Sequence, residues 1–293
     1  MDLRIGTILL ADRALNQIPV LAKHGFESFE ITFGESTSGY SLPEMASQIR
    51  DALGDSGATI SCIGVYANVL DGTGIHADAL RSMEEAIERA QLFGCSIVSC
   101  FAGRVPGASV EESLPKFRKV FLPLVERAKD NGVRLVMENC SMGDSWKNGS
   151  WNIATNPDAW EMLFEQIPDS ALGLEWEPAH QLTALIDPIP QLRRWAKRIY
   201  HVHGKDATVA WDVLREHGIN SPVRYCWDRT PGFGDSNWAD IITILRMNGY
   251  TGAIDIEGYH DPVYSTPERE WTAQLEALKY LKHCRGGSEL LLL

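Results

Sequence analysis

The chain has 293 residues, of which 44% are hydrophobic and 23% charged, and this globular composition excludes a fibrous or disordered protein. The chain has 27 Lys and Arg residues and 39 Asp and Glu residues, and the resulting net charge of -12 repels nucleic-acid phosphates and anionic membranes. No stretch approaches the ~18 apolar residues of a membrane span, and the cysteines are widely spaced, as in reduced cytosolic proteins. We therefore expect a cytoplasmic protein with no nucleic-acid or membrane partner.

Short runs of apolar and β-branched residues alternate eight times with segments of helical period. A helix is expected after each strand. The helices expected over residues 77–93 and 114–131 are each followed directly by a glycine, which is common at helix ends. In chain order, the expected strands cover residues 4–10, 26–33, 59–67, 96–103, 133–139, 172–180, 199–206 and 253–260.

Eight βα units in an unbroken series favour a closed barrel over an open doubly wound sheet. An open dinucleotide-binding sheet would need a glycine-rich turn after its first strand, where this chain has the sequence ADRA at residues 11–14. We predict a single α/β domain, a (β/α)8 TIM barrel over residues 1–285, followed by a flexible tail at residues 286–293.

Acidic and histidine side chains mark the ends of the last four expected strands, where barrels place their catalytic groups. Side chains alternate along a strand, so the later residue of each i, i+2 pair lies nearer the mouth of the barrel. Three carboxylates and one imidazole suit Mn2+, Mg2+, Co2+ or Fe2+. A salt-bridge network is the alternative, but four such groups are costly to bury without a cation. The predicted metal ligands are Glu138, Glu177, His203 and Glu257.

Other polar residues near these strand ends have open assignments. Glu30 is predicted to contact the substrate or to support the ligands. Lys205 is predicted to bind a substrate oxygen or phosphate, with an ion pair to Asp206 as the alternative. The earlier members of the i, i+2 pairs either orient the ligands or are buried polar groups lower in the barrel: Glu175, His201 and Asp255.

Five motifs together resemble the xylose-isomerase-like sugar phosphate isomerase/epimerase superfamily. They are MEN around Glu138, EPAH from Glu177, HVHGKD from His201, RTPGFGD from Arg229 and NGYTGAIDIEGYHDP from Asn248. In that superfamily one divalent metal is held by the glutamate ending strand five, the acid of a D-x-x-H motif, the second His of H-x-H and the glutamate ending strand eight. The resemblance therefore implies the ligands Glu138, Glu177, His203 and Glu257.

The resemblance also implies roles in catalysis. Glu138 and Glu257 would act as acid and base on opposite faces of a bound sugar, and His180 would contact substrate hydroxyls. The metal would polarise a carbonyl and its neighbouring hydroxyl, so that a carboxylate can remove the adjacent proton through an enediolate. Mn2+ is the first choice, with Mg2+, Co2+, Fe2+ or Zn2+ as alternatives. The expected partner is a small sugar or keto-sugar, and a homo-oligomer or partner subunit is left open.

The main prediction is a metal-dependent sugar isomerase or epimerase, but two positions depart from the family. Glu177 replaces the usual Asp, and residues 207–209 lack the arginine that ketose 3-epimerases have after H-x-H. The missing arginine favours a larger substrate, and hence the alternative of a lyase or hydratase acting on 3-keto-glycosides, including C-deglycosidase-type elimination. Four aromatic residues near the loops support the same alternative: Trp146, Trp151, Trp176 and Trp227.

Two further readings rank lower. A non-catalytic sugar-binding subunit would keep the metal only for its structure. An abasic-site nuclease of the same superfamily would need three metal ions and a basic groove, which the few histidines and the net charge of -12 do not supply.

Overall fold

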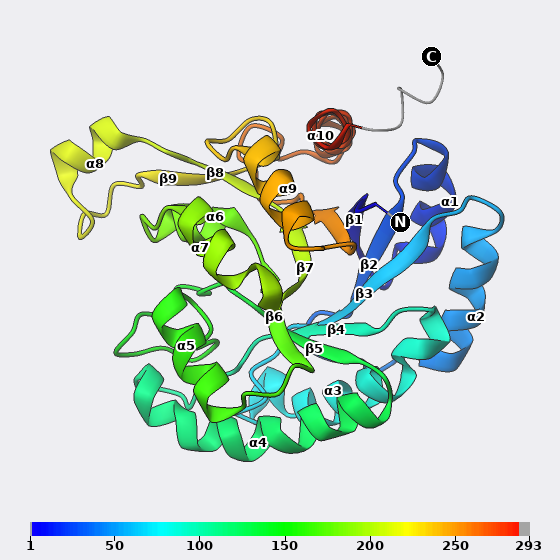
Figure 1. The fold of residues 1–293 in the computed structure, drawn as a ribbon, viewed down its shortest axis with the longest axis horizontal. Coiled ribbons are helices and arrows are strands. Elements are labelled where there is room, and N and C mark those ends of the chain that lie inside the picture. The colour runs from blue at the N-terminus through cyan, green and yellow to red at the C-terminus, as the bar shows by residue number, and fades with distance from the viewer. Residues whose placement is uncertain (1, 287–293) are drawn as a thin grey trace. The chain divides into compact units, whose positions relative to one another are not determined.

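The structure, a computed structural model, describes residues 2–286. Its parallel strands are hydrogen-bonded in the order β1-β10-β7-β6-β5-β4-β3-β2 and close into a barrel with helices around it (Figure 1). The predicted α/β fold class, a single (β/α)8 TIM barrel, is confirmed. Over the described residues, no helix combines the length and the apolar character that crossing a membrane requires.

The elements follow one another as strand and helix, with one hairpin added. The barrel strands are β1 (Arg4–Leu10), β2 (Ser28–Thr32), β3 (Thr59–Val65), β4 (Ile97–Cys100), β5 (Arg134–Glu138), β6 (Leu172–Trp176), β7 (Ile199–Gly204) and β10 (Ala253–Ile256). The antiparallel hairpin consists of β8 (Asp206–Val209) and β9 (Cys226–Arg229). The α-helices are α1 (Ala14–Lys23), α2 (Leu42–Leu53), α3 (Ala79–Arg89), α4 (Val110–Asp130), α5 (Pro157–Gln166), α6 (Pro178–Thr183), α7 (Pro188–Trp195), α8 (Trp211–His217), α9 (Trp238–Met247) and α10 (Pro267–Arg285). The short 3-10 helices are η1 (Gly74–His76), η2 (Ala90–Phe93) and η3 (Ala196–Arg198).

Seven of the eight barrel strands end earlier than the sequence suggested, and only β1 ends at Leu10 as predicted; β6 and β10 differ most. β6 stops at Trp176 because Pro178 occupies the first turn of α6, whose N-cap is Glu177. His180 therefore lies on a helix and not on a strand. β10 stops at Ile256, so Glu257 directly follows it. These shifts still leave both glutamates at the carboxyl ends of barrel strands.

Two other differences concern α4 and an aromatic residue. The helix predicted from residue 114 begins at Val110, because Ser109 and Glu112 form a capping box at its start.

Trp176 was counted among the loop aromatics, but it lies within β6 and is fully buried. That part of the expectation was wrong.

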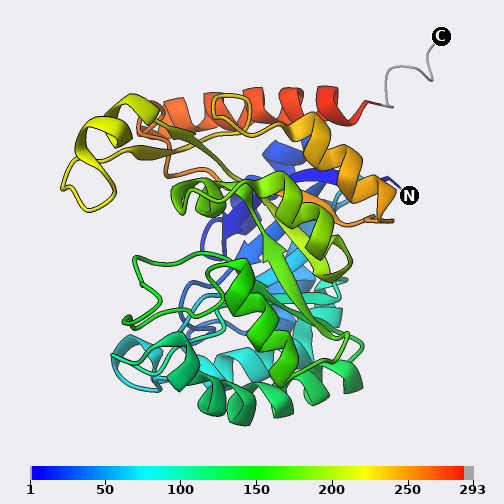
Figure 2. The ribbon, with the colours of Figure 1, turned by 60° about the vertical axis from the view of Figure 1, so that its left-hand side comes forward.

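The described residues form two compact units. Unit 1 holds residues 2–7, 177–197 and 203–286. Within it β1 pairs in parallel with β10, from Arg4 opposite Ala253 to Thr7 opposite Ile256. Helices α9 and α10 pack side by side (Figure 2). The β8–β9 hairpin packs against α6 and carries α8 between its two strands.

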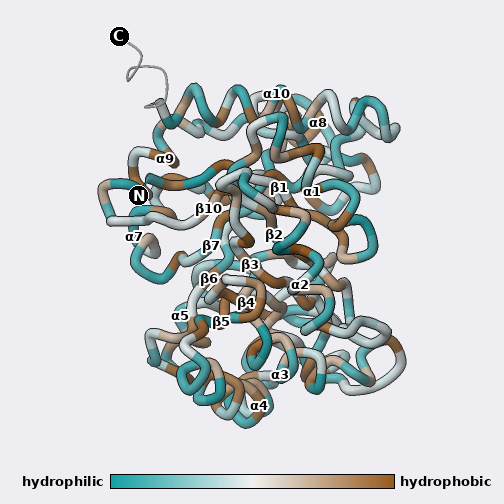
Figure 3. The backbone as a smooth tube through the Cα atoms, turned by 90° about the vertical axis from the view of Figure 1, so that its right-hand side faces the viewer, coloured by the Kyte–Doolittle hydropathy of each residue, from teal (hydrophilic) through white to brown (hydrophobic). Residues whose placement is uncertain are grey.

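Unit 2 holds residues 8–176 and 198–202. Strands β2 to β6 are parallel neighbours within it. Hydrophobic residues lie along β2, β3 and β4 (Figure 3). On α4 the rings of Phe117 and Phe121 stack with their centroids 4.5 Å apart. Both side chains are fully buried, and removing such apolar surface from water favours folding.

The predicted domain boundary at residue 285 coincides with the end of α10 at Arg285. Of the tail predicted at residues 286–293, only Gly286 is described, and the rest lies outside the described residues. Both the boundary and the tail stay predictions.

Candidate metal centre

Three of the four predicted metal ligands come together in unit 1. Glu177 follows β6, His203 lies in β7 and Glu257 follows β10. One ligand atom from each of the three lies within 4.8 Å of the others. Glu177 and His203 are buried, and the Glu257 side chain is 13% exposed. Two carboxylates and one imidazole therefore converge where the ends of barrel strands meet.

A glycine allows two of these strands to approach closely. The backbone N–H of Glu257 donates to the carbonyl of Gly204 at 3.2 Å. A Cβ atom at residue 204 would lie 3.1 Å from the Cα of Ile256, which is tighter than ordinary contact. Because residue 204 is glycine, Glu257 can sit beside His203, with 3.4 Å between Oε2 and Nδ1.

Lys205 contacts both carboxylates of this cluster. Its Nζ lies 2.9 Å from Oε1 of Glu257 and 3.9 Å from Oε1 of Glu177. The carboxylate of Asp206 is used elsewhere, because it accepts hydrogen bonds from Nε1 of Trp238 at 3.0 Å and from the backbone N–H of Ser236 at 3.0 Å. Lys205 therefore forms its ion pairs with the candidate ligands Glu257 and Glu177. Its predicted contact with substrate stays a prediction.

Two histidines each contact one glutamate of the cluster with the same sequence spacing. Nε2 of His180 lies 2.5 Å from Oε1 of Glu177, and Nε2 of His260 lies 3.1 Å from Oε1 of Glu257. His260 was missed in the sequence, because residue 260 was placed at the end of an extended strand. Tyr259, with φ +71°, turns the chain after β10 and returns His260 to Glu257. The repeated E-x-x-H spacing was the available signal.

The two carboxylates of the cluster have opposite pKa shifts. Burial raises the pKa of Glu177 well above its usual range, against the charge of Lys205. Burial acts on Glu257 in the same direction, but Lys205 and hydrogen bonds from His203 and His260 hold the pKa of Glu257 well below its usual range. Lys205 and the two histidines therefore favour the charged form of Glu257, while burial disfavours the charged form of Glu177.

This charge balance and these donors fit a divalent cation. Two carboxylates and one imidazole match the preferences of Mn2+, Mg2+, Fe2+ or Co2+. A cation would supply positive charge next to the carboxyl group of Glu177, whose charged form burial disfavours. The residues of unit 1 therefore suit a metal ion by both chemistry and charge.

The fourth predicted ligand, Glu138, is the last residue of β5 in unit 2. It is 6% exposed and lies opposite Glu175 in the β5–β6 register. Its backbone carbonyl accepts a hydrogen bond of 2.9 Å from Nδ2 of Asn152. Its predicted roles as ligand and acid/base group stay predictions.

A second group of buried polar side chains lies in unit 2. Nδ1 of His201 lies 2.7 Å from Oε1 of Glu175 and 3.6 Å from Oε2 of Glu30. The hydroxyl of Tyr66 lies 2.6 Å from Oε1 of Glu30 and 2.7 Å from Oε2 of Glu175, and Ser99 also donates to Glu175. Glu175 and His201 thus pair with each other, and both alternatives left open for them stay predictions.

Tyr66 was not singled out in the sequence. Burial, with the charges of Glu175 and Glu30, raises the pKa of Tyr66 well above its usual value, so its hydroxyl stays protonated. No sequence motif marks this residue, which directly follows β3. Only the closure of the barrel brings it to carboxylates from other strands.

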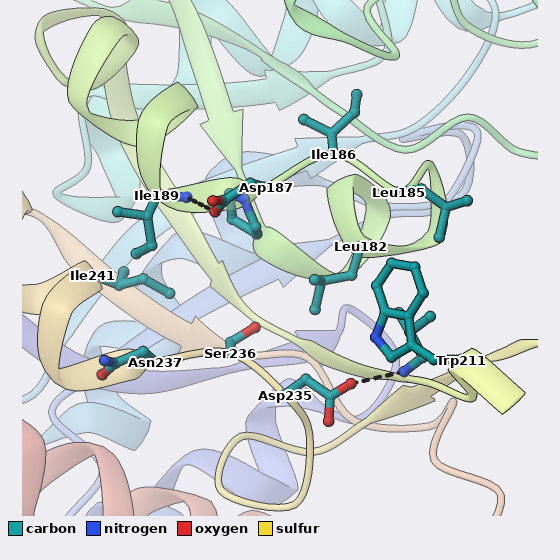
Figure 4. Close-up of a pocket in the computed structure, with 12 residues that line it drawn as sticks. Leu182, Leu185, Ile186, Asp187, Ile189, Trp211, Asp235, Ser236, Asn237 and Ile241 are labelled. Atoms are coloured by element: carbon teal, nitrogen blue, oxygen red, sulfur yellow. Dashed lines mark hydrogen bonds between the residues drawn. The ribbon is translucent and has the colours of Figure 1, made fainter.

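An apolar cavity of about 340 Å3 lies elsewhere in unit 1 (Figure 4). Leu182, Trp211 and Ile241 are among its lining residues, and none of the candidate metal ligands is. Its acidic groups are engaged in local structure, because Asp187 accepts from the N–H of Ile189 and Asp235 from the N–H of Val209.

Comparison with known proteins gives one family and several distant relatives. The profile of the xylose isomerase-like TIM barrel family matches residues 18–281. The uncharacterised protein YfiH of Bacillus subtilis (strain 168) is 23% identical over 88% of this chain and 91% of its own length. An inosose dehydratase of Clostridium beijerinckii is 29% identical over 54% of this chain, and the match spans about half (50%) of that enzyme. The structure of a 3-keto-D-glucoside 4-epimerase from E. coli shares the fold, with a TM-score of 0.70, 17% identity and coverage of 97% of this chain and 100% of that one.

Proposed function

This chain belongs to the xylose isomerase-like TIM barrel family, and we propose that it is a divalent-metal-dependent enzyme that isomerises or epimerises a sugar or keto-sugar. The reaction begins with removal of a proton beside a carbonyl. The convergence of Glu177, His203 and Glu257 carries this proposal, because the cluster combines buried carboxylates with an imidazole at barrel strand ends. The substrate is a small molecule, as the family and the net charge of -12 suggest.

We assign Glu138 as the fourth ligand, because it ends β5 and matches the family motif. Mn2+ is the first choice for the ion, with Mg2+, Co2+, Fe2+ and Zn2+ as alternatives. When bound, the ion supplies Lewis-acid polarisation of the substrate carbonyl, which acidifies the adjacent C–H.

In this proposal, protein side chains remove and return the proton beside the substrate carbonyl. Glu257 is assigned as the base because it carries no proton: Lys205 and its histidine neighbours hold its pKa well below the usual range, against the effect of burial, and keep it ionised. Glu138 acts as the second acid/base group. His180 and Lys205 bind substrate oxygens, since both have donor nitrogens next to the ligands.

Of the two roles predicted for Glu30, substrate contact and support of the metal ligands, we assign it the second. Its side chain is fully buried and contacts Tyr66 and His201. A buried carboxylate with these partners orients neighbouring side chains.

A second candidate is a lyase or dehydratase on a keto-sugar or 3-keto-glycoside. The same proton removal leads to elimination when a leaving group stands β to the carbonyl, and this group must be protonated as it departs. His260 is suited to be that acid, because it is 51% exposed and its hydrogen bond to Glu257 raises its pKa. The inosose dehydratase relative points the same way.

Exchange of substrate C–H for solvent deuterium tests the proposal. The full chain is incubated in D2O with and without Mn2+ on ketoses, inositol-type ketones and 3-keto-glycosides, and the products are analysed by mass spectrometry. We expect metal-dependent exchange on at least one substrate class. A product of unchanged mass apart from deuterium indicates isomerisation or epimerisation, and loss of water or an aglycone indicates the lyase.

The decisive variant is Glu257→Gln, with Glu276→Gln as its matched control. Glu276 is a half-exposed residue of α10 that pairs with Lys279. We expect the first variant to lose exchange by at least about a hundredfold, as for removal of a general base, and the second to keep it. Metal binding without exchange on any substrate would overturn the proposal in favour of a sugar-binding subunit.

A further inference from the structure

Residues 210–225, here called the arm, join β8 to β9 and include α8. The arm extends beyond α6 and away from α9 and α10 (Figure 1 and Figure 2). None of the side chains of α8 is buried, whereas every other described α-helix has buried side chains. A helix this short is normally stabilised by packing. The arm therefore presents a surface that the described residues leave uncovered.

The base of the arm is fixed to the rest of unit 1. The backbone N–H of Ala210 donates to the carbonyl of Tyr225 at 2.8 Å, and the hydroxyl of Tyr225 donates to the carbonyl of Thr183 in α6 at 2.9 Å. A small buried apolar cluster also joins the hairpin strands to α6: Ala179, Ala207, Val209 and Cys226. The arm is thus held in its direction before it meets any partner, which lowers the entropic cost of a contact.

Large apolar side chains are exposed along the arm. Ile219 and Val223, which follow α8, form its tip and are 61% and 41% exposed. Trp211, the first residue of α8, is 51% exposed. Single exposed apolar residues are common, but several on one projecting segment are typical of a contact with another protein.

The apolar cavity of about 340 Å3 lies at the base of the same arm (Figure 4). Trp211 lines it from the arm, together with Leu182, Leu185 and Ile186 from α6 and the residues that follow it. Trp211 and Leu185 are exposed, so the cavity is accessible from solvent. A cavity of this size accepts a small ligand or a few aliphatic side chains.

The arm is neutral on a strongly acidic protein. It carries two acidic residues, Asp212 and Glu216, and two arginines, Arg215 and Arg224. The whole chain has a net charge of -12, so two copies repel each other on average. This repulsion is smallest where the two approaching segments have no net charge. The charge distribution therefore favours the arm as the place where two copies meet.

We propose that the arm is the contact of a homodimer, in which Ile219 and Val223 of one copy enter the apolar cavity of a second copy. The inference goes beyond the proposed function and does not depend on it. Because the tip and the cavity lie at opposite ends of one arm, a two-fold axis between antiparallel arms brings each tip to the cavity of the other copy. The two contacts form together, and the assembly closes at two copies. Both contacts remove apolar surface from water.

Sedimentation velocity of the full chain over a wide range of concentrations tests the dimer. We expect a species of about twice the 32.6 kDa mass of one chain, with a Kd of about 1 μM. Ile219→Glu should weaken the dimer by at least about a hundredfold, because a carboxylate would have to enter the apolar cavity. Ile75→Glu is the matched control, since Ile75 is the same residue type, is 62% exposed and lies in η1, outside the arm. This variant should dimerise as the parent does.

Disulfide cross-linking locates the contact. Ile219→Cys and Leu185→Cys chains are purified separately, mixed and oxidised, with the parent oxidised in parallel as a control for the native cysteines. We expect a linked dimer in the mixture, because the tip of one copy faces the cavity of the other. Ile219→Cys alone should stay unlinked, since the two tips lie at opposite ends of the paired arms. Circular dichroism should show parental secondary structure in every variant, because the substituted side chains are exposed.

Three results would overturn the inference. A parent that stays monomeric at all concentrations would leave an apolar small molecule or a different protein as the occupant of the cavity. A dimer that persists unchanged in folded Ile219→Glu would place the contact on another face. Cross-linking of Ile219→Cys alone, as readily as in the mixture, would show that the tips meet each other and not the cavity.

Discussion

The ammonium group of Lys205 lies 2.9 Å from Glu257 and 3.9 Å from Glu177, so one cation contacts both carboxylates of the candidate metal centre. Opposite charges at such distances attract strongly where water is largely excluded. Lys205 and a divalent ion therefore compete for the same negative charge. The affinity of the centre for metal is set partly by a residue that is not a ligand.

Replacing Lys205 by Met should strengthen metal binding and impair catalysis. Removing the competing charge raises the affinity for Mn2+ by about tenfold, while turnover falls because a substrate contact is lost. Isothermal titration calorimetry of the purified variant measures the affinity. Lys279→Met, which removes an exposed ion pair with Glu276 on α10, should leave affinity unchanged. Weaker Mn2+ binding in Lys205→Met would contradict this account.

Metal affinity should rise with pH. Because burial raises the pKa of Glu177, this group keeps its proton at pH values where a free glutamate is ionised, and a metal ion must displace that proton. Affinity therefore increases by about tenfold per pH unit below the raised pKa and levels off above it. Calorimetry in two buffers with different ionisation heats measures the released proton. Glu177→Gln should abolish that release, and a parent protein that releases no proton would refute the assignment.

Gly204→Ala should destabilise unit 1 and disturb the centre together. The added methyl group meets the backbone of Ile256 at 3.1 Å, so β7 and β10 must move apart and carry Glu257 away from His203. We expect a loss of about 1–3 kcal/mol in the free energy of unfolding, together with weaker metal binding. Urea denaturation and calorimetry measure the two effects. Full stability with parental Mn2+ affinity would show that the contact relaxes freely.

Asp144→Asn should destabilise unit 2 through its loop. The guanidinium of Arg104 is fully buried 3.6 Å from Asp144 and also donates to the carbonyls of Ala108, Ser145 and Trp146. Removing one partner of a buried ion pair costs roughly 3 kcal/mol. Asp169→Asn breaks an exposed pair with Lys129 in the same unit and should cost under about 1 kcal/mol. Similar urea midpoints for the two variants would contradict the prediction.

The barrel was predictable from the sequence because its signals are local. Hydrophobic alternation and helix-ending glycines located the eight barrel strands, and the period of two along each strand selected Glu177, His203 and Glu257 over their neighbours. Pro178 was an available signal for the end of β6, since proline favours the first turn of a helix.

The missed features depend on contacts between segments that are distant in sequence or on a single backbone angle. The hairpin of β8 and β9 joins segments separated by a helix, and nothing in residues 206–209 specifies their partner. His260 returns to Glu257 only because Tyr259 adopts φ +71°, a conformation that few non-glycine residues take. Tyr66 meets Glu30 and Glu175 through strand neighbours that only the closed sheet defines.

The amides of Asn68 and Asn152 have a consequence for the timing of turnover. Each uses its full hydrogen-bonding capacity to join segments beyond β3, β4 and β5, so these segments lose their conformational freedom when the protein folds. They are then poorly suited to act as a lid that opens and closes in every catalytic cycle. For the proposed activity, we therefore expect no slow gating step from this part of the chain.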